Sequence, residues 1–134
     1  MTGGKKFSDT LKQMRINLSS CKAVNYAFLF GSSLNNFPYS RDIDILIGGV
    51  LPFIDRVNLA SDLEVICKKN VDLVLADEAP VELVMKAFSS GYPILIRDKE
   101  KLKEDYFRYF YAYDDKIDLK QIEIARLKRR YNSG

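Results

Sequence analysis

Two aspartates stand in an otherwise apolar run, DIDILIGG, which covers residues 42–49. Side chains alternate between the two faces of a β-strand, so Asp42 and Asp44 would point one way and Ile43 and Ile45 the other. Two carboxylates on one face of a partly buried strand repel each other, and their burial is costly unless cations or other partners neutralise them. The run therefore predicts a strand that carries a ligand site on one face.

An apolar strand that ends in a Gly-Ser pair precedes this run. Residues 23–30, AVNYAFLF, are apolar on both faces, as is typical of a central strand, and Gly31 and Ser32 follow directly. A backbone turn at such a pair can bring amide donors close to an anion. Carboxylates that hold divalent cations, set opposite amides and a hydroxyl that hold phosphate, are what phosphoryl or nucleotidyl transfer requires.

A further carboxylate, Asp72, lies in a third apolar run, VDLVLAD, at residues 71–77. If this strand lies beside the strand of Asp42 and Asp44, Asp72 completes a cluster of three acids. Two Mg²⁺ ions roughly 3.5–4 Å apart need about that many acidic ligands. An isolated Asp-x-Asp or Gly-Ser is common, so only the combination indicates a site. We interpret Asp77 as a turn residue or helix cap.

Helices are predicted around these strands. The segment of residues 7–20 has Leu11, Met14 and Leu18 on one face, with Ser8 or Asp9 as its cap. The other predicted elements are a helix over residues 53–70 with an apolar side of Ile54, Val57, Leu63, Ile66 and Cys67, a helix over 79–91 opened by Pro80 and closed by Gly91, and a strand over 92–98. The expected fold is α/β, a small mixed sheet of about four strands flanked by helices, in one domain of residues 1–134.

From residue 98 onwards the pattern predicts a long amphipathic helix, or a helix pair broken at Asp114 and Asp115. Its stripe, spaced by four and three, consists of Tyr106, Phe110, Tyr113, Ile117, Lys120, Ile124, Leu127 and Tyr131. Two interpretations of this arm, residues 98–134, stay open: packing on the sheet, or a surface for another chain. We predict that its half beyond Asp115 packs on another chain.

Composition excludes several classes of protein. The chain has no histidine among its 134 residues, which excludes Ser-His hydrolases and His-ligated zinc. The net charge of +3 is too small to indicate nucleic-acid binding by itself. Cys21 and Cys67 lack metal-type spacing and are expected to be reduced. No apolar run is long enough to span a bilayer and the N-terminus lacks the apolar core of a signal peptide, which together predict a cytoplasmic protein.

At the residues named above, the sequence resembles the DNA polymerase β-type nucleotidyltransferase superfamily. More narrowly, it is similar to the minimal nucleotidyltransferase (MNT) proteins, many of which are the antitoxin half of HEPN–MNT toxin–antitoxin modules. The shared pattern is an apolar strand, Gly31-Ser32, then Asp42-Ile43-Asp44 on the next strand and Asp72 one strand later. Two departures are visible: nine residues rather than the usual ten separate Ser32 from Asp42, and Asn35-Asn36 replaces the family's common Arg-Gly.

The resemblance implies a nucleotidyltransferase that moves AMP from Mg-ATP to a hydroxyl, most plausibly a tyrosine of a HEPN-family toxin. Asp42, Asp44 and Asp72 would be the catalytic and metal-binding residues, holding two Mg²⁺ ions, and Asp72 would help to deprotonate the acceptor. Gly31 and Ser32 would hold the β- and γ-phosphates of ATP. Membrane association and direct nucleic-acid binding are not expected, and a homo-oligomer through the C-terminal helix stays open. The alternative is a non-catalytic antitoxin or assembly subunit that neutralises its partner by binding.

Overall fold

The protein is described by a computed structural model that covers residues 3–31 and 39–114, with side chains from residue 8 onwards. In chain order the elements are α1 (Gly3–Ser20), β1 (Tyr26–Phe30), β2 (Asp42–Gly48), α2 (Phe53–Cys67), β3 (Asn70–Leu75), the short 3₁₀ helix η2 (Ala76–Glu78), α3 (Val81–Ser90) and β4 (Tyr92–Ile96). A last helix covers residues 99–114 and is called the 99–114 helix below.

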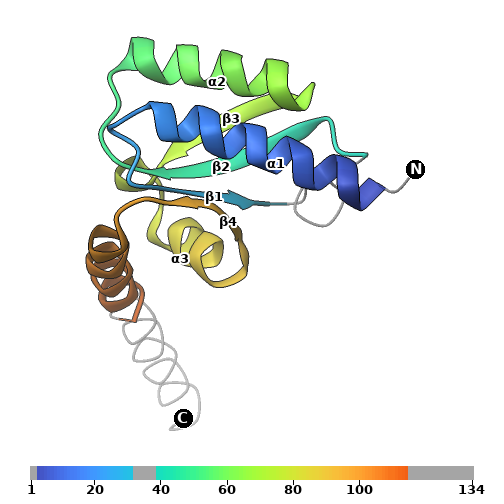
Figure 1. Cartoon of the computed structure of the whole chain (residues 1–134). Coiled ribbons are helices and arrows are strands. Elements are labelled where there is room, and N and C mark those ends of the chain that lie inside the picture. The colour runs from blue at the N-terminus through green and yellow to red at the C-terminus, as the bar shows by residue number, and fades with distance from the viewer. Residues whose placement is uncertain (1–2, 32–38, 115–134) are drawn as a thin grey trace, which may run out of the picture.

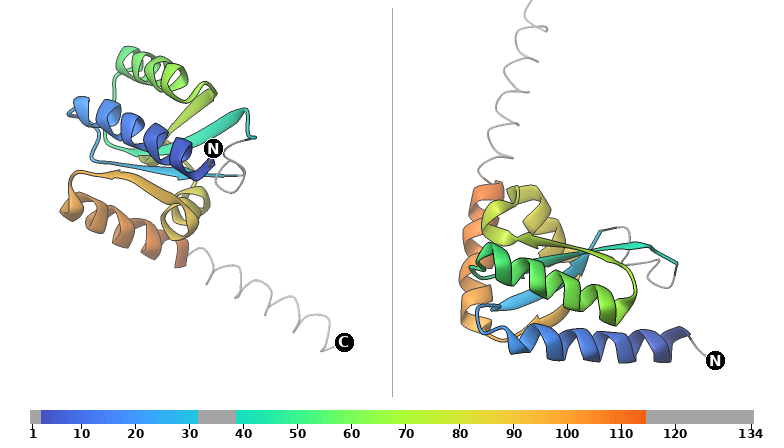
Figure 2. Two further views of the ribbon diagram at one scale, coloured as in Figure 1. Left: turned by 45° about the vertical axis from the view of Figure 1, so that its right-hand side comes forward. Right: turned by 90° about the horizontal axis from the view of Figure 1, so that it is seen from above.

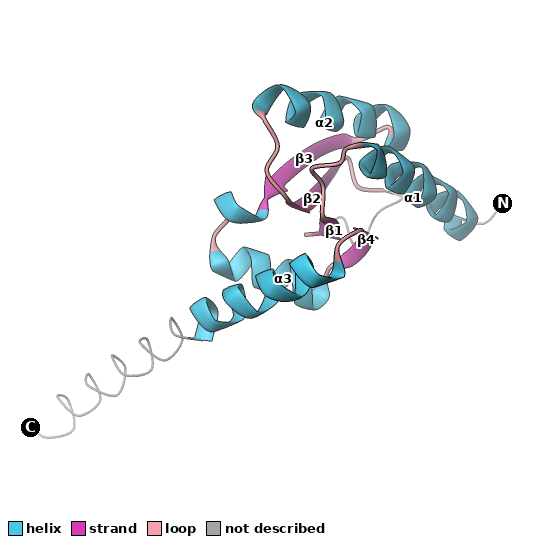
Figure 3. Ribbon diagram, turned by 60° about the vertical axis from the view of Figure 1, so that its left-hand side comes forward, coloured by secondary structure: helices cyan, strands magenta, loops and turns pink. Residues whose placement is uncertain are grey.

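The four strands form one mixed sheet in the order β3-β2-β1-β4. β1 is antiparallel to both β2 and β4, whereas β2 and β3 are parallel and are joined by α2. Helices α1 and α2 cover one face of the sheet, and α3 and the 99–114 helix lie on the other (Figure 1). Further views show the same two layers of helices on either side of the strands (Figures 2 and 3). The predicted α/β fold with a small mixed sheet is confirmed.

Strand alternation divides the core between the two faces. Ile43, Ile45 and Ile47 of β2 pack with α1 and α2, while Leu46 faces α3. Asp42 and Asp44 share the face of Leu46 because side chains two positions apart point the same way. This confirms the predicted division of β2 into an isoleucine face and an aspartate face.

Helix boundaries and faces differ from the predictions at two places. α1 begins at Gly3, so Ser8 and Asp9 lie inside the helix and cap nothing, although Leu11, Met14 and Leu18 are buried as predicted. In α2, Ile54 and Val57 are 62% and 41% exposed, so that part of the predicted apolar side is wrong. Leu63 and Cys67 are buried as predicted, and with Leu59, which was not predicted, they form a stripe spaced by four residues that lies against the sheet.

The predicted ends of the helix over residues 79–91 are confirmed. Pro80 stands at the N-cap of α3 and Gly91 at its C-cap. Both cysteines are free thiols, with Cys67 buried and Cys21 partly exposed. Within residues 3–31 and 39–114, no helix combines the length and the hydropathy of a membrane span. The half of the arm beyond Asp115, and Ser32 with Asn35 and Asn36, lie outside the described residues.

A buried carboxylate attaches the 99–114 helix to the sheet. Asp105 is 4% exposed and accepts a 2.8 Å hydrogen bond from the hydroxyl of Tyr26 on β1. Lys101 and Arg108 each form an ion pair with Asp105 Oδ1 at 3.3 Å. The ring of Tyr26 lies over Gly48, where an added Cβ would come within 2.1 Å of ring carbons. Gly48 therefore makes room for the tyrosine that reaches Asp105.

A second acid, Asp77 of η2, holds the same helix. Arg108 donates to its Oδ1 at 3.0 Å, and the Tyr109 hydroxyl donates to the same oxygen at 2.9 Å. Burial and the hydrogen bond to Asp77 raise the pKa of Tyr109 to about 12. Asp77 was interpreted from the sequence as a turn residue or cap. It lies in the 3₁₀ turn as that interpretation requires, and its carboxylate binds the 99–114 helix.

Candidate active site

The parallel pairing of β2 and β3 brings two of the three predicted acids side by side. Asp44 pairs in register with Asp72, and Asp42 with Asn70. Leu73 and Leu75 of β3 belong to the core under α1 and α2, so Asp72 points to the aspartate face of β2. The prediction that the third strand lies beside the second is confirmed, and it places Asp42, Asp44 and Asp72 on one face of the sheet.

Gly31 lies directly against this group. It follows β1, whose last residue, Phe30, pairs with Asp44. Its φ of +84° is a conformation that L side chains rarely adopt, and an added Cβ would stand 2.7 Å from Asp44 Oδ2. Only glycine fits this position without displacing the carboxylate. The other member of the predicted phosphate-binding pair, Ser32, lies outside the described residues.

The three acids carry charge that nothing in the described structure neutralises. Asp44 is half-buried, and its pKa is raised, first by burial and then by repulsion from Asp72 and Asp42. Asp42 and Asp72 are exposed. None of the three forms an ion pair with a residue of 8–31 or 39–114. Such unpaired acids on adjacent strands favour the binding of a cation.

Asn70 is a neighbour of this site that sequence reasoning missed. Its side-chain amide donates to Asp42 Oδ1 at 2.9 Å, and its backbone N–H donates to the carbonyl of Arg41 at the same distance. Asn70 thus fixes one oxygen of the Asp42 carboxylate and leaves the other free. The sequence could have placed Asn70 near the site, because it stands two residues before Asp72 and therefore on the same strand face.

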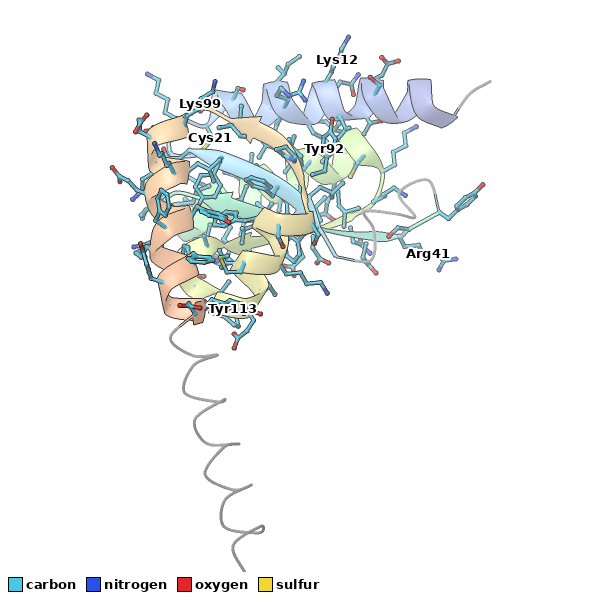
Figure 4. The ribbon with its side chains drawn as sticks, turned by 90° about the horizontal axis from the view of Figure 1, so that it is seen from below. Lys12, Cys21, Arg41, Tyr92, Lys99 and Tyr113 are labelled. Atoms are coloured by element: carbon cyan, nitrogen blue, oxygen red, sulfur yellow. The ribbon has the colours of Figure 1, made fainter. Side chains whose placement is uncertain are left out.

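A polar hollow of about 570 Å³ opens beside Asn70, at the start of β2 and β3. Arg41, Lys68 and Lys69 line it together with Glu64, and the Lys69 ammonium donates to the carbonyl of Ser40. Arg41 extends outward from the start of β2 (Figure 4). From the sequence, Arg41 is a possible substitute for the basic residue that Asn35 replaces, but residues adjacent in a strand face opposite ways, which argues against it.

The donor chemistry of the site fits a hard divalent cation, because all three candidate ligands are carboxylates. Among the described residues, however, no three His, Cys, Asp or Glu side chains are already gathered into a metal-binding group. The sheet register brings the carboxylates onto one face, and their mutual repulsion opposes closer approach. Their roles as metal ligands and catalytic residues stay predictions.

The sequence itself matches a known protein family. Residues 12–100 match the family described as Polymerase beta, Nucleotidyltransferase. This match includes α1 from Lys12, all four strands and every candidate site residue. The chain therefore belongs to the polymerase beta nucleotidyltransferase family, which confirms the resemblance drawn from Gly31-Ser32, Asp42, Asp44 and Asp72.

Solved toxin–antitoxin structures contain chains with the same fold. A toxin–antitoxin structure with AMP-PNP has a TM-score of 0.69 at 21% identity, covering 87% of this chain and 97% of that one. The toxin–antitoxin MntA–HepT has a TM-score of 0.67 at 20% identity, covering 90% and 97%. A tri-AMPylated HEPN toxin of Shewanella oneidensis in complex with MNT antitoxin has a TM-score of 0.60 at 21% identity, covering 85% and 98%. No curated protein sequence matches at a significant level.

Proposed function

We propose that this chain is a Mg²⁺-dependent nucleotidyltransferase that moves AMP from ATP to a hydroxyl, in particular a tyrosine, of a HEPN-type toxin, and thereby acts as its antitoxin. The observation that carries the proposal is the pairing of Asp44 with Asp72, with Gly31 in contact with the same carboxylate. One residue each of β2 and β3 and the glycine that follows β1 thus converge where an acceptor, a phosphate and cations have to meet.

In the transfer, the acceptor oxygen forms a bond to the α-phosphorus of ATP, and the bond from that phosphorus to the pyrophosphate oxygen breaks. The hydroxyl proton leaves toward Asp72, which lies at the exposed edge of the site. Bound Mg²⁺ would neutralise the phosphate oxygens and the three carboxylates. Asp42 and Asp44 would hold the cations, and the backbone after Phe30, at Gly31 and Ser32, would hold the terminal phosphates.

The partner is proposed from the solved relatives. Among the structures of the same fold, one contains AMP-PNP and another contains an AMPylated HEPN toxin bound to its MNT antitoxin. The chain would work as one nucleotidyltransferase domain of residues 1–134, with residues 98–134 as its helical arm. This arrangement leaves the acceptor to be supplied by a second protein.

The transfer is tested with ATP labelled at the α-phosphate and the product of the gene beside the one for this chain, used as the proposed HEPN protein. We expect label on the HEPN protein only with Mg²⁺, its loss when the acceptor tyrosine is replaced by phenylalanine, and none with Asp44→Asn. Asp62→Asn, at an exposed position on α2, is the matched control and should label as wild type does. Equal labelling in EDTA and in Mg²⁺, or with Asp44→Asn, would contradict the proposal.

One residue favours the binding-only alternative: Asn35 replaces the arginine of the family's common Arg-Gly, a basic residue expected to help hold the triphosphate. A non-catalytic antitoxin would neutralise the HEPN protein without ATP, and Asp44→Asn would neutralise it equally well. The two candidates are separated by measuring the toxin's activity with wild type and Asp44→Asn, each with and without Mg-ATP. Neutralisation that requires both ATP and Asp44 identifies the enzyme.

A further inference from the structure

The 99–114 helix carries an exposed aromatic row on the face that does not bind Asp77 or the sheet. Tyr106, Phe107, Phe110 and Tyr111 are 40%, 48%, 41% and 64% exposed. Tyr106 and Phe110 stack with their ring centroids 6.2 Å apart, and Phe107 meets Tyr106 edge to face. Neighbouring aromatic side chains exposed together on one helix are typical of a protein-binding surface.

A hollow of about 340 Å³ opens at one end of this row. Its apolar lining consists of Phe28, Phe88, Leu102, Tyr106 and Phe107. Two lysines one helical turn apart, Lys99 and Lys103, also line it, and neither forms an ion pair with any residue of the described segments. Lys101, on another side of the same helix, is instead paired with Asp105. The hollow therefore combines an apolar floor with two unpaired positive charges.

We propose that this hollow and the aromatic row form a docking surface for a segment of a partner protein that presents an apolar side chain flanked by acidic residues. The apolar side chain would fill the hollow, where a buried anchor contributes most of the binding free energy. The acidic residues would pair with Lys99 and Lys103, which would set orientation and association rate.

The chain's own remaining segments do not fit as occupants. Residues 115–134 contain six basic and three acidic residues, and residues 1–7 contain two lysines and no acid. A second copy of the chain also carries a net charge of +3. The two terminal segments would bring positive charge toward Lys99 and Lys103, residues 32–38 carry no acid, and a second copy adds net positive charge, whereas an acidic partner would neutralise the two lysines.

The surface lies apart from the aspartates. Lys99, at the start of the 99–114 helix, and Arg41, next to Asp42, lie on opposite sides of the molecule (Figure 4). A partner docked on the helix would leave the aspartate edge open to nucleotide. The inference rests on the proposed function in one respect, because the partner used to test it is the HEPN protein of the transfer experiment.

The test compares affinities for that HEPN protein by calorimetry. Lys99→Glu with Lys103→Glu should weaken binding at least about tenfold, and Phe107→Ser should weaken it by a similar factor. The control is Lys12→Glu, at an exposed position on α1, the helix that covers the other face of the sheet, and it should bind as wild type does. All variants should keep wild-type, Mg²⁺-dependent ATP binding, which also shows that they are folded.

The outcomes separate the two proposals. Wild-type affinity in both the double lysine variant and Phe107→Ser overturns the docking surface alone, and the transfer proposal stands. Absence of any binding by the wild type overturns both. Loss of self-association in sedimentation velocity, with unchanged affinity for the HEPN protein, shows that a second copy occupies the surface and also overturns the inference. If the double glutamate variant does not fold, Lys99→Gln with Lys103→Gln takes its place.

Discussion

Two groups of carboxylates lie on the same side of the sheet, and they differ in whether other side chains of the protein pair with them. Asp77 and Asp105, beside the 99–114 helix, accept hydrogen bonds from tyrosine hydroxyls and form ion pairs with Arg108. Asp44 and Asp72 pair in register on β2 and β3, and neither forms an ion pair with a basic side chain of the described residues. The pKa of Asp44 is raised by burial and by its acidic neighbours.

The presence or absence of pairing separates carboxylates that stabilise the fold from carboxylates that are placed to bind a ligand. A buried carboxylate that is fully hydrogen-bonded and paired holds two elements together, and its loss destabilises the protein. Carboxylates that repel one another lower the stability of the free protein, and a site of this kind is maintained only when something outside the chain neutralises it. The predictions below test this contrast in order of decreasing effect.

The largest effect is expected at Asp44. Asp44→Asn should reduce AMP transfer on the order of 10³-fold, because cation binding at such a site contributes several kcal/mol to the transition state. In EDTA the variant should be as stable as wild type or slightly more so, since a repelled carboxylate is removed. Single-turnover transfer and urea unfolding measure the two quantities. A variant that loses transfer and also unfolds would make Asp44 a structural residue.

The opposite pattern is expected at Asp105. Asp105→Ala should lower the free energy of unfolding by about 3 kcal/mol, because it leaves the buried Tyr26 hydroxyl and the cations around it without their partner. ATP binding in Mg²⁺ should be retained by the folded fraction. Glu104→Ala, at the exposed neighbouring position, is the control and should change stability little. Equal stability of the two variants would remove the distinction between the carboxylate groups.

A smaller effect on the site alone is expected at Asn70. Asn70→Ala removes the hydrogen bond that orients Asp42 and should weaken metal binding about tenfold, as loss of an outer partner of a metal ligand commonly does. Titration with Mn²⁺, followed by the electron spin resonance of free Mn²⁺, measures this without any transfer reaction. Asn58→Ala, exposed on α2, serves as the control. Unchanged Mn²⁺ affinity would mean that the hydrogen bond of Asn70 to Asp42 does not contribute to metal binding.

The smallest effect concerns alkaline pH. The pKa of Tyr109 is raised by burial and the hydrogen bond to Asp77 from 10.0 to about 12 in the folded protein. Its contribution to stability is therefore complete below pH 10 and is lost as the pH rises through 12. Tyr109→Phe should be about 1 kcal/mol less stable than wild type at pH 8, and the difference should shrink between pH 10 and 12. A constant difference over this range would contradict the assignment.

Much of the fold was predictable from local pattern. The alternation in β2 identified its two faces before any pairing was known, and Pro80 and Gly91 marked the two ends of α3. The face of α2 was not predictable in full, because Ile54 and Val57 are apolar yet lie on the exposed side of the helix, away from the buried stripe of Leu59, Leu63 and Cys67. Which apolar residues of a helix are buried depends on where it crosses its neighbours.

The candidate site was predictable only where residue type and spacing carried the signal. Asp42, Asp44 and Asp72 follow from alternation, but the parallel register that pairs Asp44 with Asp72 is a tertiary fact. The contacts of Asn70 with Asp42, and of Arg108 with Asp77, join residues 28 and 31 positions apart. Alternation places Asn70 on the strand face of Asp72 but does not place it opposite Asp42. The contact of Arg108 with Asp77 has no pattern in the sequence, because other acids were equally available to Arg108.

The parallel crossover through α2 also affects how the protein is made. β1 and β2 are sequential antiparallel strands, whereas Asp72 reaches Asp44 only after α2 has packed and β3 has paired across it. Contacts of such long sequence separation form late, because the entropy of closing the loop must be overcome first. A nascent chain that has emerged from the ribosome only as far as α2 could pair β1 with β2 but would have no Asp72 beside Asp44. If the chain is the transferase proposed above, it could act on its partner only once β3 has been synthesised and has paired with β2.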